Sequence, residues 1–573
     1  MGEIYFRQNQ FPNALESFYK ALALAESQGD ANRITSTSTR IADLLRVSGQ
    51  PAEAIAFYHK AIQQTESARA LLQSEDYRQS YFEGGLGAYV SMIETLLAAS
   101  KPGEAFNYNE RARSRLFLDV LGSKVRLSRT KGNLQEEEKS LSENLATLSA
   151  RFAAEREAAE TLREELARER GEIEQRYSAF IDKVRNKDRE QASLMNVEPL
   201  KLTEIQALLD PGQTLLEYFV TPEKTFLWVV TKDRLKALTI PISDKDLAVK
   251  VGALRKAISE LRSIPEYRKV ARDLYGLLLG PALSDIKGKE LMIVPHGILH
   301  YLPFQALYSP RGKYLIEEHS LSYLSSASLL QFTTAKRKPR REKILAVGNP
   351  RLINPAIELN AAESETREVA RLYPGSTTLV KREATEEKIK RLSMGYDVLH
   401  FAAHAELRDD DPLSSAILLA NEGKEDGRLE VREIFQMNIN ADLVVLSGCE
   451  TGLGKVSDGD EFVGLTRAFI YAGTPSVIAS LWKVEDSSTA RLMASFYKNL
   501  KTMSKVKALR QAQLQLIRGD ASSDLLARRG IGGVGKLGEV PEAKPQSPTP
   551  GPVSISTSHP YFWAPFILVG DGK

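Results

Sequence analysis

Two residues in this sequence have the chemistry of a nucleophile and its general base: Cys449 and His404. Cys449 is the only cysteine among 573 residues. A thiol becomes a strong nucleophile when a neighbouring imidazole removes its proton, and the same imidazole can then protonate a leaving amine. The alternative is that Cys449 is a small buried side chain, as most unpaired cysteines are.

The two residues are 45 positions apart, so the fold must bring them together. Each ends an apolar run, YDVLHFAAH (396–404) or ADLVVLSGC (441–449), that is typical of a buried strand. Neighbouring parallel strands end at the same edge of a sheet, and open α/β folds build their sites at this edge. We therefore expect His404 and Cys449 to meet there.

Neither a metal site nor a nucleotide site is predicted. On a strand, His400 and His404 would share a face but stand about 13 Å apart, because each residue rises about 3.3 Å. This separation is too large for one metal ion. The segment GIGGVGK (530–536) has the spacing of a phosphate-binding loop but lacks the strand before it and the helix after it. Leu537 also replaces the Ser or Thr that such a loop requires.

Short apolar runs alternate with helical patterns through the C-terminal part of the sequence. This alternation predicts a mostly parallel sheet with helices on both faces. The predicted strands lie in 214–240, 290–296, 343–350, 396–404, 415–420, 441–449, 476–482 and 562–570, and the predicted helices lie at 358–373, 384–394, 461–472 and 487–500. His296 and His300, near the strand at 290–296, are predicted to be structural.

The N-terminal part contains a degenerate repeat that resembles a tetratricopeptide array. Small residues seven apart allow close helix packing, with Phe18 or Tyr58 filling the gap in the first two units. The alanine pairs are Ala14/Ala21, Ala54/Ala61 and Ala105/Ala112. The first unit begins near Met1, so we expect further repeats upstream. A charged, alanine-rich segment at 133–184 predicts a long helix or a helical hairpin.

Composition excludes several classes of protein. A single cysteine excludes internal disulfides and cysteine-based zinc sites. A net charge of only +3 gives no reason to expect nucleic acid as a partner, and the basic run at 336–342 is predicted to be a linker. No secretory signal and no apolar run of about 20 residues is visible, so we expect a cytoplasmic protein without a membrane span.

Several motifs resemble the CHAT domain, a caspase- and separase-like family. They are VLHFAAHAELRDDDPLSSAILLA, ADLVVLSGCETGLGKVSDGDEFVGLTRAFIYAGTPSVIASLWKVED, HPYFWAPFILVGDG, LMIVPHGILHYLPFQALY and YLIEEHSLSYLSSASLL. The resemblance covers roughly 200–573. It implies four regions: tetratricopeptide-like repeats at 1–122, a helical connector at 123–200, an N-terminal CHAT subdomain at 201–335, and a caspase-like peptidase domain at 336–573 with a loop at 529–558.

The resemblance also implies a His–Cys dyad without a cofactor. By motif, His404 is the general base and acid, and Cys449 is the nucleophile. The oxyanion would be held by the backbone N–H groups of Cys449 and Ala405, where many relatives have glycine in place of Ala405. An alanine still offers this N–H.

Substrate specificity is predicted to come from SLWKVED (480–486). Trp482 could form the wall of a subsite or pack in the core. Asp486 resembles the separase position whose carboxylate receives a basic P1 side chain, and its alternative role is to cap the following helix.

These observations predict a regulated cysteine endopeptidase that cuts a protein substrate after Arg or Lys, with the repeats recognising an activator or the substrate. The alternatives are a non-catalytic scaffold with a degenerate peptidase fold and a repeat adaptor whose C-terminal domain only oligomerises. The presence of both dyad residues in intact motifs favours the peptidase.

Overall fold

The computed structural model describes the chain in separate stretches. The described residues are 1–70, 75–122, 199–338, 341–352, 359–408, 414–421, 425–448, 455–456, 462–482, 484–519 and 556–573. Cys449, the predicted connector at 123–200 and the predicted loop at 529–558 lie outside these stretches, except for residues 199–200 and 556–558. Among the described helices, none has the length and apolarity needed to cross a bilayer.

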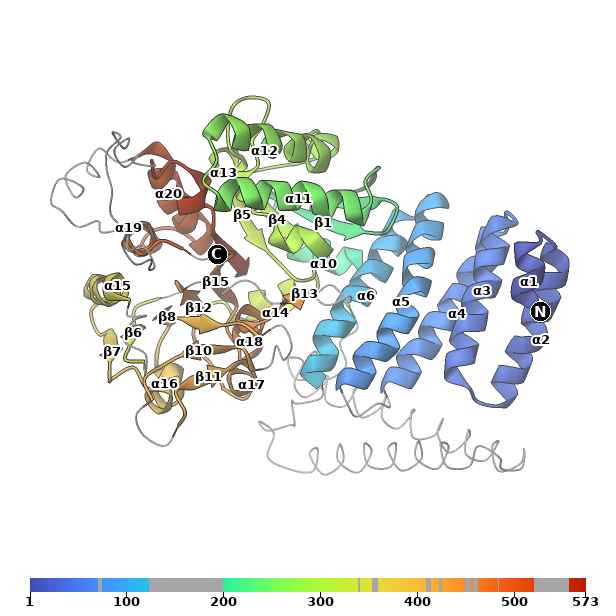
Figure 1. Ribbon diagram of the computed structural model, residues 1–573, viewed down its shortest axis with the longest axis horizontal. Coiled ribbons are helices and arrows are strands. Elements are labelled where there is room, and N and C mark those ends of the chain that lie inside the picture. Colours follow the sequence, from blue (N-terminus) through green and yellow to red (C-terminus); the bar gives the residue numbers. More distant parts are fainter. Residues whose placement is uncertain are drawn as a thin grey trace, which may run out of the picture.

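The N-terminal region is a row of antiparallel helices that stack side by side (Figure 1). They are α1 (Gly2–Arg7), α2 (Phe11–Ser27), α3 (Ala31–Val47), α4 (Pro51–Ala70), α5 (Glu75–Ala98) and α6 (Pro102–Gly122). Five of the six repeat alanines are buried, as predicted, but Ala21 is exposed. The buried stripe of α2 runs through Ala14, Phe18, Leu22 and Ala25, and Ala21 lies beside its edge.

One sheet of eleven strands organises the rest of the described chain, in the order β3-β2-β1-β4-β5-β16-β15-β12-β8-β6-β7. The strands are β1 (Gln213–Val220), β2 (Thr225–Val230), β3 (Leu235–Ile240), β4 (Glu290–Val294), β5 (Ser320–Tyr323), β6 (Ile344–Pro350), β7 (Thr377–Lys381), β8 (Val398–Ala402), β12 (Leu443–Leu446), β15 (Ser476–Ser480) and β16 (Phe566–Gly570). Neighbours are parallel from β1 through β4 to β5, and from β15 through β12, β8 and β6 to β7. The pairs β1–β2, β2–β3 and β15–β16 are antiparallel. The sheet is therefore mostly parallel, as predicted.

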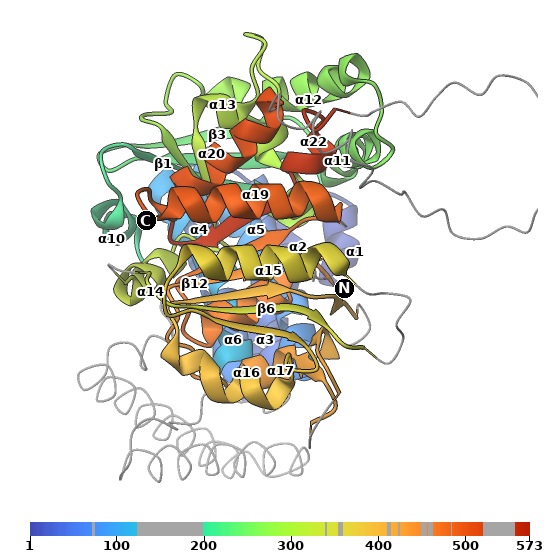
Figure 2. The ribbon, with the colours of Figure 1, turned by 90° about the vertical axis from the view of Figure 1, so that its left-hand side faces the viewer.

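Helices cover both faces of this sheet (Figure 2). They are α10 (Leu202–Leu208), α11 (Asp244–Ser259), α12 (Ile264–Leu278), α13 (Leu315–Glu318), α14 (Leu329–Lys336), α15 (Asn360–Leu372), α16 (Glu386–Leu392), α17 (Val431–Ile434), α18 (Leu465–Tyr471), α19 (Asp486–Leu500), α20 (Lys505–Arg518) and α22 (Pro560–Trp563). Successive residues of a strand point to opposite faces. Val444 and Leu446 accordingly join the core shared by the repeats and α16–α18, whereas Leu443 and Val445 join the core under α11, α12, α15, α19 and α20.

One predicted strand is not part of the main sheet. The run at 415–420 forms β10 (Ala416–Leu418), which lies outside the main sheet and pairs antiparallel with β9 (Ala405–Glu406) and β11 (Arg428–Glu430). A second small sheet pairs β13 (Lys455–Val456) with β14 (Phe462–Val463). The apolar run at 415–420 predicted a strand, but an apolar run does not show with which other strands it pairs.

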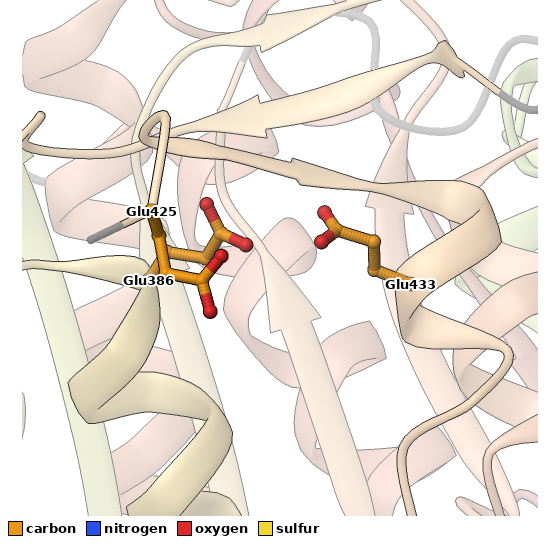
Figure 3. A group of neighbouring side chains, drawn as sticks. All are labelled: Glu386, Glu425 and Glu433. Atoms are coloured by element: carbon orange, nitrogen blue, oxygen red, sulfur yellow. The ribbon is translucent and has the colours of Figure 1, made fainter.

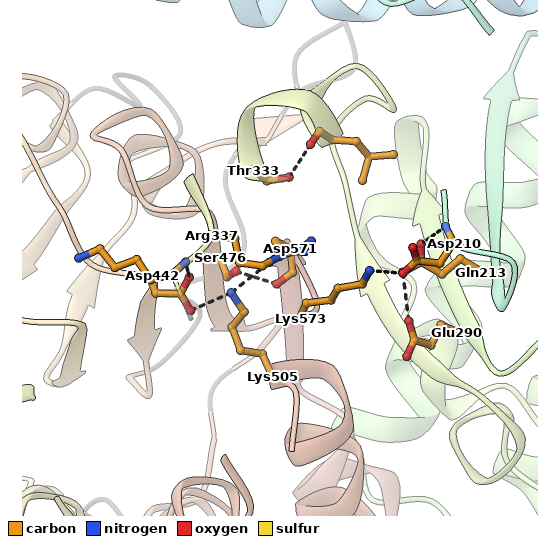
Figure 4. A network of polar contacts seen from close by, with 12 residues as sticks. Asp210, Gln213, Glu290, Thr333, Arg337, Asp442, Ser476, Lys505, Asp571 and Lys573 are labelled. Carbon is orange, nitrogen blue, oxygen red and sulfur yellow. Dashed lines mark hydrogen bonds and ion pairs between the residues drawn. The ribbon is translucent and has the colours of Figure 1, made fainter. Parts of the chain in front are cut away.

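A buried ionic cluster joins distant segments at the amino edge of β12 and β15 (Figure 4). The side chain of Lys505, at the start of α20, is fully buried. Its Nζ lies 3.0 Å from Oδ2 of Asp442 and 3.4 Å from Oδ2 of Asp571. Arg341 adds a contact of 2.5 Å to Asp442, and Arg337 adds two hydrogen bonds of 2.8 and 2.6 Å to Asp571. The cluster therefore ties together the start of β12, the end of β16 and the segment before β6.

Helix α6 is joined to the α/β region by buried polar groups. The carboxylate of Glu110 accepts hydrogen bonds from the backbone N–H groups of Ala327 at 3.0 Å and Ser328 at 2.7 Å. These two residues precede α14, so a side chain of the repeat region caps a helix of the α/β region. Arg113 donates to the Pro295 carbonyl at 2.7 Å. The junction is therefore a specific polar interface as well as an apolar one.

Glu217 of β1 depends on the same helix. Its side chain is fully buried, Asn109 donates a hydrogen bond to it, and Nε of Arg113 lies 3.9 Å from its Oε1. Burial and then the nearby Glu110 carboxylate raise the pKa of Glu217 well above its ordinary value. Without α6, this buried acid would lose its hydrogen-bond donor and its nearest positive charge.

We expect Asp442→Asn to lower the free energy of unfolding at neutral pH by about 3 kcal/mol, because it leaves the Lys505 ammonium buried with less compensating charge. Burial alone would raise the pKa of Asp442, but Lys505 and Arg341 hold it below its ordinary 3.8. The stabilisation by the ionised carboxylate is thus complete above about pH 3.8 and is lost as the pH falls through the lower folded-state pKa. Denaturant titrations should show a clear difference in the free energy of unfolding between the wild type and Asp442→Asn at neutral pH. The difference should become small at acidic pH.

Asp285→Asn is the matched control for this prediction. Asp285 also pairs with a lysine, at 2.7 Å from Lys236, but the pair lies at the surface. Its loss should cost less than about 1 kcal/mol. Equal losses in the two variants would contradict a special role for the buried cluster.

The α6 junction predicts where the chain tolerates truncation. A chain that lacks residues 1–98 keeps α6 and should fold. A chain that lacks residues 1–122 has lost α6, so Glu217 and the start of α14 lose their partners and the apolar face around Trp228, which Phe106 covers, becomes exposed to water. Thermal unfolding of the two fragments should therefore show the shorter one to be clearly less stable. Equal midpoints of thermal unfolding in the two fragments would show that α6 does not stabilise the α/β region.

Candidate active site

His404 stands at the carboxyl edge of the sheet. Strand β8 is buried at every position and ends at Ala402, and His404 follows two residues later, half-buried. The carbonyl oxygen of His404 accepts a hydrogen bond of 2.8 Å from the N–H of Leu418 in β10. The backbone of the predicted base is thus held by the small three-stranded sheet.

Strand β12 ends beside β8 at the same edge. The two strands are parallel, with Leu446 opposite Phe401. The ladder continues one residue further, because the N–H of Ser447 donates to the Phe401 carbonyl at 2.9 Å. His404 lies three residues beyond Phe401, and Cys449 lies three residues beyond Leu446. Cys449 itself is outside the described residues, so its contact with His404 remains a prediction.

The backbone N–H of Ala405 points away from the three-stranded sheet. Ala405 lies opposite Ile417, and the bond from Leu418 to His404 flanks this pair. In an antiparallel ladder, a residue of such a pair turns its own N–H to the other side. Since β9 is an edge strand, this N–H is directed out of the sheet. Such an orientation is compatible with the predicted oxyanion role, which is untested.

His400 is part of a fully buried group on one face of β8. Its Nε2 lies 3.0 Å from Oε1 of Glu365 on α15, and its Nδ1 lies 3.1 Å from the hydroxyl of Tyr497 on α19. Nδ1 therefore has a hydrogen-bond partner, whereas Nε2 lies close to a carboxylate oxygen without a hydrogen bond, and the buried position is typical of a structural histidine. Sequence reasoning missed Glu365 and Tyr497. The available signal is that Glu365 falls on the buried stripe of an amphipathic helix with Ala362 and Val369.

The other two histidines predicted to be structural, His296 and His300, lie after β4. Nδ1 of His296 accepts a hydrogen bond of 3.2 Å from the N–H of Val220, and its ring stands edge-on to Phe219 with the centroids 4.7 Å apart. His300 is buried in the following 3-10 helix, Gly297–Tyr301. These contacts are of the kind expected for structural histidines.

The two predicted substrate contacts follow β15. The side chain of Trp482 is buried, with 7% exposed, and its indole N–H donates to the Tyr561 carbonyl at 3.2 Å. Most of the ring thus packs in the core, and a subsite role for its remaining edge is untested. Helix α19 begins at Asp486, whose side chain lies outside what the structure describes.

The cap of α19 is Glu485. Its carboxylate accepts hydrogen bonds from the backbone N–H groups of Ser487 at 3.0 Å and Ser488 at 2.7 Å. Burial alone would raise the pKa of Glu485, but these hydrogen bonds hold it below its ordinary value. The alternative in which Asp486 caps this helix is therefore wrong, because the helix starts one residue earlier than that assignment required.

Three carboxylates gather beside the three-stranded sheet (Figure 3). Oxygens of Glu386, Glu425 and Glu433 lie within 4.8 Å of one another. The ammonium of Lys390 lies 2.5 Å from the first carboxylate, 3.6 Å from the second and 2.7 Å from the third. Burial raises the pKa of Glu386 to about 7. The single ammonium of Lys390 offsets part of the negative charge of these three carboxylates, so the group is an ion-pair cluster.

Among curated proteins, the chain is similar to tetratricopeptide repeat protein 28 of Homo sapiens. The two are 23% identical over 356 residues, which is 52% of this chain and 13% of that protein. The Mus musculus protein of the same name is 25% identical over 289 residues, which is 40% of this chain and 12% of that protein. The chain thus matches only about an eighth of the length of these relatives.

Among solved structures, the chain is similar to separase in the Saccharomyces cerevisiae separase–securin complex. The TM-score is 0.42 at 10% identity, and the match covers 98% of this chain and 50% of that chain. The Arg-specific cysteine proteinase gingipain R matches with a TM-score of 0.32 at 10% identity, over 57% of this chain and 74% of that chain. Both are distant likenesses.

A family match covers more than half of the chain. Residues 268–571 match the CHAT domain family. The match includes β8, β12, β15 and β16, and therefore the whole edge that carries His404. It confirms the resemblance that the motifs had indicated, and the helical repeats lie in front of it. The chain therefore belongs to the CHAT domain family, with tetratricopeptide-like repeats preceding the domain.

Proposed function

We propose that this chain is a regulated cysteine endopeptidase with Cys449 as nucleophile and His404 as general base and acid. The observation that carries the proposal is the register of β8 and β12, in which each of these residues lies three positions beyond a paired residue. Neighbouring strands are about 4.8 Å apart. Extensions of equal length from paired positions would bring a thiol and an imidazole within reach of each other, which supports the proposed dyad.

The proposed reaction proceeds through a thioester. The imidazole of His404 takes the proton of the Cys449 thiol, and the thiolate attacks the carbonyl carbon of the substrate peptide bond. The backbone N–H groups of Cys449 and Ala405 stabilise the oxyanion that forms. The His404 imidazolium then protonates the leaving amine. Water, deprotonated by His404, hydrolyses the thioester and restores the thiol.

We further propose that the enzyme cuts after Arg or Lys and that Asp486 binds this side chain. Glu485 already caps α19, so the Asp486 carboxylate is not needed for that purpose. Asp486 also follows β15, whose carboxyl end lies beside the end of β12. A carboxylate holds a guanidinium through two parallel hydrogen bonds, which favours Arg over Lys.

The repeats are proposed to bind a protein activator or the substrate. The junction at α6 supports this role, because Glu110 and Arg113 link the repeats directly to backbone atoms near β4 and α14. A partner that displaces α6 would therefore alter the α/β region. The second candidate, a non-catalytic scaffold, has the same interface but requires no turnover.

We expect Cys449→Ala and His404→Ala each to lower the turnover of a cleavable peptide by at least about 10³-fold, because both act in the same chemical step. Thermal unfolding should change little, since His404 is only half-buried and Cys449→Ala removes a single sulfur atom. A P1-arginine fluorogenic peptide and a differential scanning measurement give the two readouts. Activity that survives in Cys449→Ala would end the peptidase proposal, because the chain has no other thiol.

His400→Ala is the control for His404→Ala. It removes a buried imidazole between Glu365 and Tyr497 and should cost about 3 kcal/mol of stability. Its effect on turnover at a temperature where the variant is folded should be much smaller. If neither the wild type nor Cys449→Ala cleaves and both bind the same protein partner, the scaffold is the better assignment.

We expect a P1-scanned peptide library to show a preference for Arg of roughly 10- to 150-fold in kcat/KM over neutral residues. Asp486→Asn should remove this preference with little loss of stability, because Glu485 is the helix cap. Glu485→Gln is the matched control and should lower stability by about 1 kcal/mol while keeping the Arg preference. A wild type that prefers Asp or an apolar residue, or an Asn variant that still prefers Arg, would exclude Asp486 from the specificity pocket.

A further inference from the structure

Ser480 is a fully buried polar residue that the proposed reaction does not use. It is the last residue of β15, and its hydroxyl donates a hydrogen bond of 2.8 Å to the carbonyl oxygen of Gly448. Gly448 comes directly before Cys449 in the sequence. A side chain from the neighbouring strand therefore holds the peptide group that also contains the N–H of Cys449.

The direction of a carbonyl sets the direction of the N–H in the same peptide group. A peptide bond is planar and trans, so its N–H points away from its carbonyl oxygen. On the opposite side, the N–H of Ser447 is bonded to the Phe401 carbonyl of β8. The last two residues before Cys449 are thus held by β15 on one side and β8 on the other.

We infer that Ser480 is a positioning residue for the oxyanion. Its hydroxyl fixes the peptide group between Gly448 and Cys449 so that the N–H faces the oxygen of the attacked carbonyl. This inference rests on the proposed function. A donor that is held in place before the reaction needs no reorganisation as charge develops, and a displacement of about 1 Å can cost about 10²-fold in rate.

The same strand supplies a matched control at its other end. Ser476 is the first residue of β15, is also fully buried, and donates a hydrogen bond of 2.7 Å to the Asp571 carbonyl. Replacing either serine by alanine removes one buried hydroxyl from one backbone carbonyl. The two changes should therefore cost similar stability, although only Ser480 lies at the carboxyl edge.

The test uses the full chain, a P1-arginine fluorogenic peptide and the rate at which iodoacetamide labels Cys449. Ser480→Ala should lower kcat roughly 10- to 100-fold with KM nearly unchanged, since only the transition state carries the oxyanion. The labelling rate should stay the same, because alkylation forms no oxyanion. Ser476→Ala should change neither rate, and Ser480→Thr, which keeps a hydroxyl, should recover most of kcat.

An unchanged kcat in Ser480→Ala, or an equal fall in Ser476→Ala, would overturn the positioning role while the dyad stands. If Ser480→Ala does not fold, Ser480→Cys offers a weaker donor of similar shape, and its kcat must fall for the inference to hold. If the wild type and Cys449→Ala are equally inert towards the peptide, the proposed function fails and this inference fails with it.

Discussion

The register of the main sheet depends on one fully buried ammonium group, that of Lys505. Two carboxylates meet it, one directly before β12 and one directly after β16, which runs beside β15. Such a cluster is costly to desolvate, and an arrangement that separates its members leaves a buried charge without its partner. It therefore favours one alignment of these strands where β12 and β15 begin and the antiparallel β16 ends, and the same alignment decides which residues meet at the carboxyl edge of β12 and β15.

At the carboxyl edge, backbone atoms do most of the positioning. The His404 carbonyl is bonded to β10, the N–H of Ser447 to β8, and the Gly448 carbonyl to a side chain of β15. These bonds come from different elements that surround the end of β12. Main-chain bonds of this kind do not depend on the identity of the side chains at the rim of the edge.

Part of this arrangement could be predicted from the sequence. The apolar runs that end at His404 and Cys449 predicted two buried strands, and the motifs predicted the family. The run at 415–420 was misplaced, because composition does not tell which strand it pairs with. Glu365, Tyr497 and Lys505 could not be assigned, since their partners are tens of residues away in the chain and a charged residue at the end of an element is usually solvated. The prediction for Ala21 was wrong although Ala61 and Ala112 are buried at the same spacing of seven residues, so this spacing alone does not decide which alanines a neighbouring helix covers.

Strand β16 occupies the sixth of eleven positions in the main sheet, between β5 and β15, and it is also the last of these strands in chain order. A ribosome makes the other ten strands first, so during synthesis the sheet exists as two separate groups of five with exposed inner edges. Such edges are templates for pairing with other chains. The nascent protein is therefore most prone to aggregation just before its central strand emerges, and the complete ionic cluster at Asp571 can form only after β16 has left the ribosome.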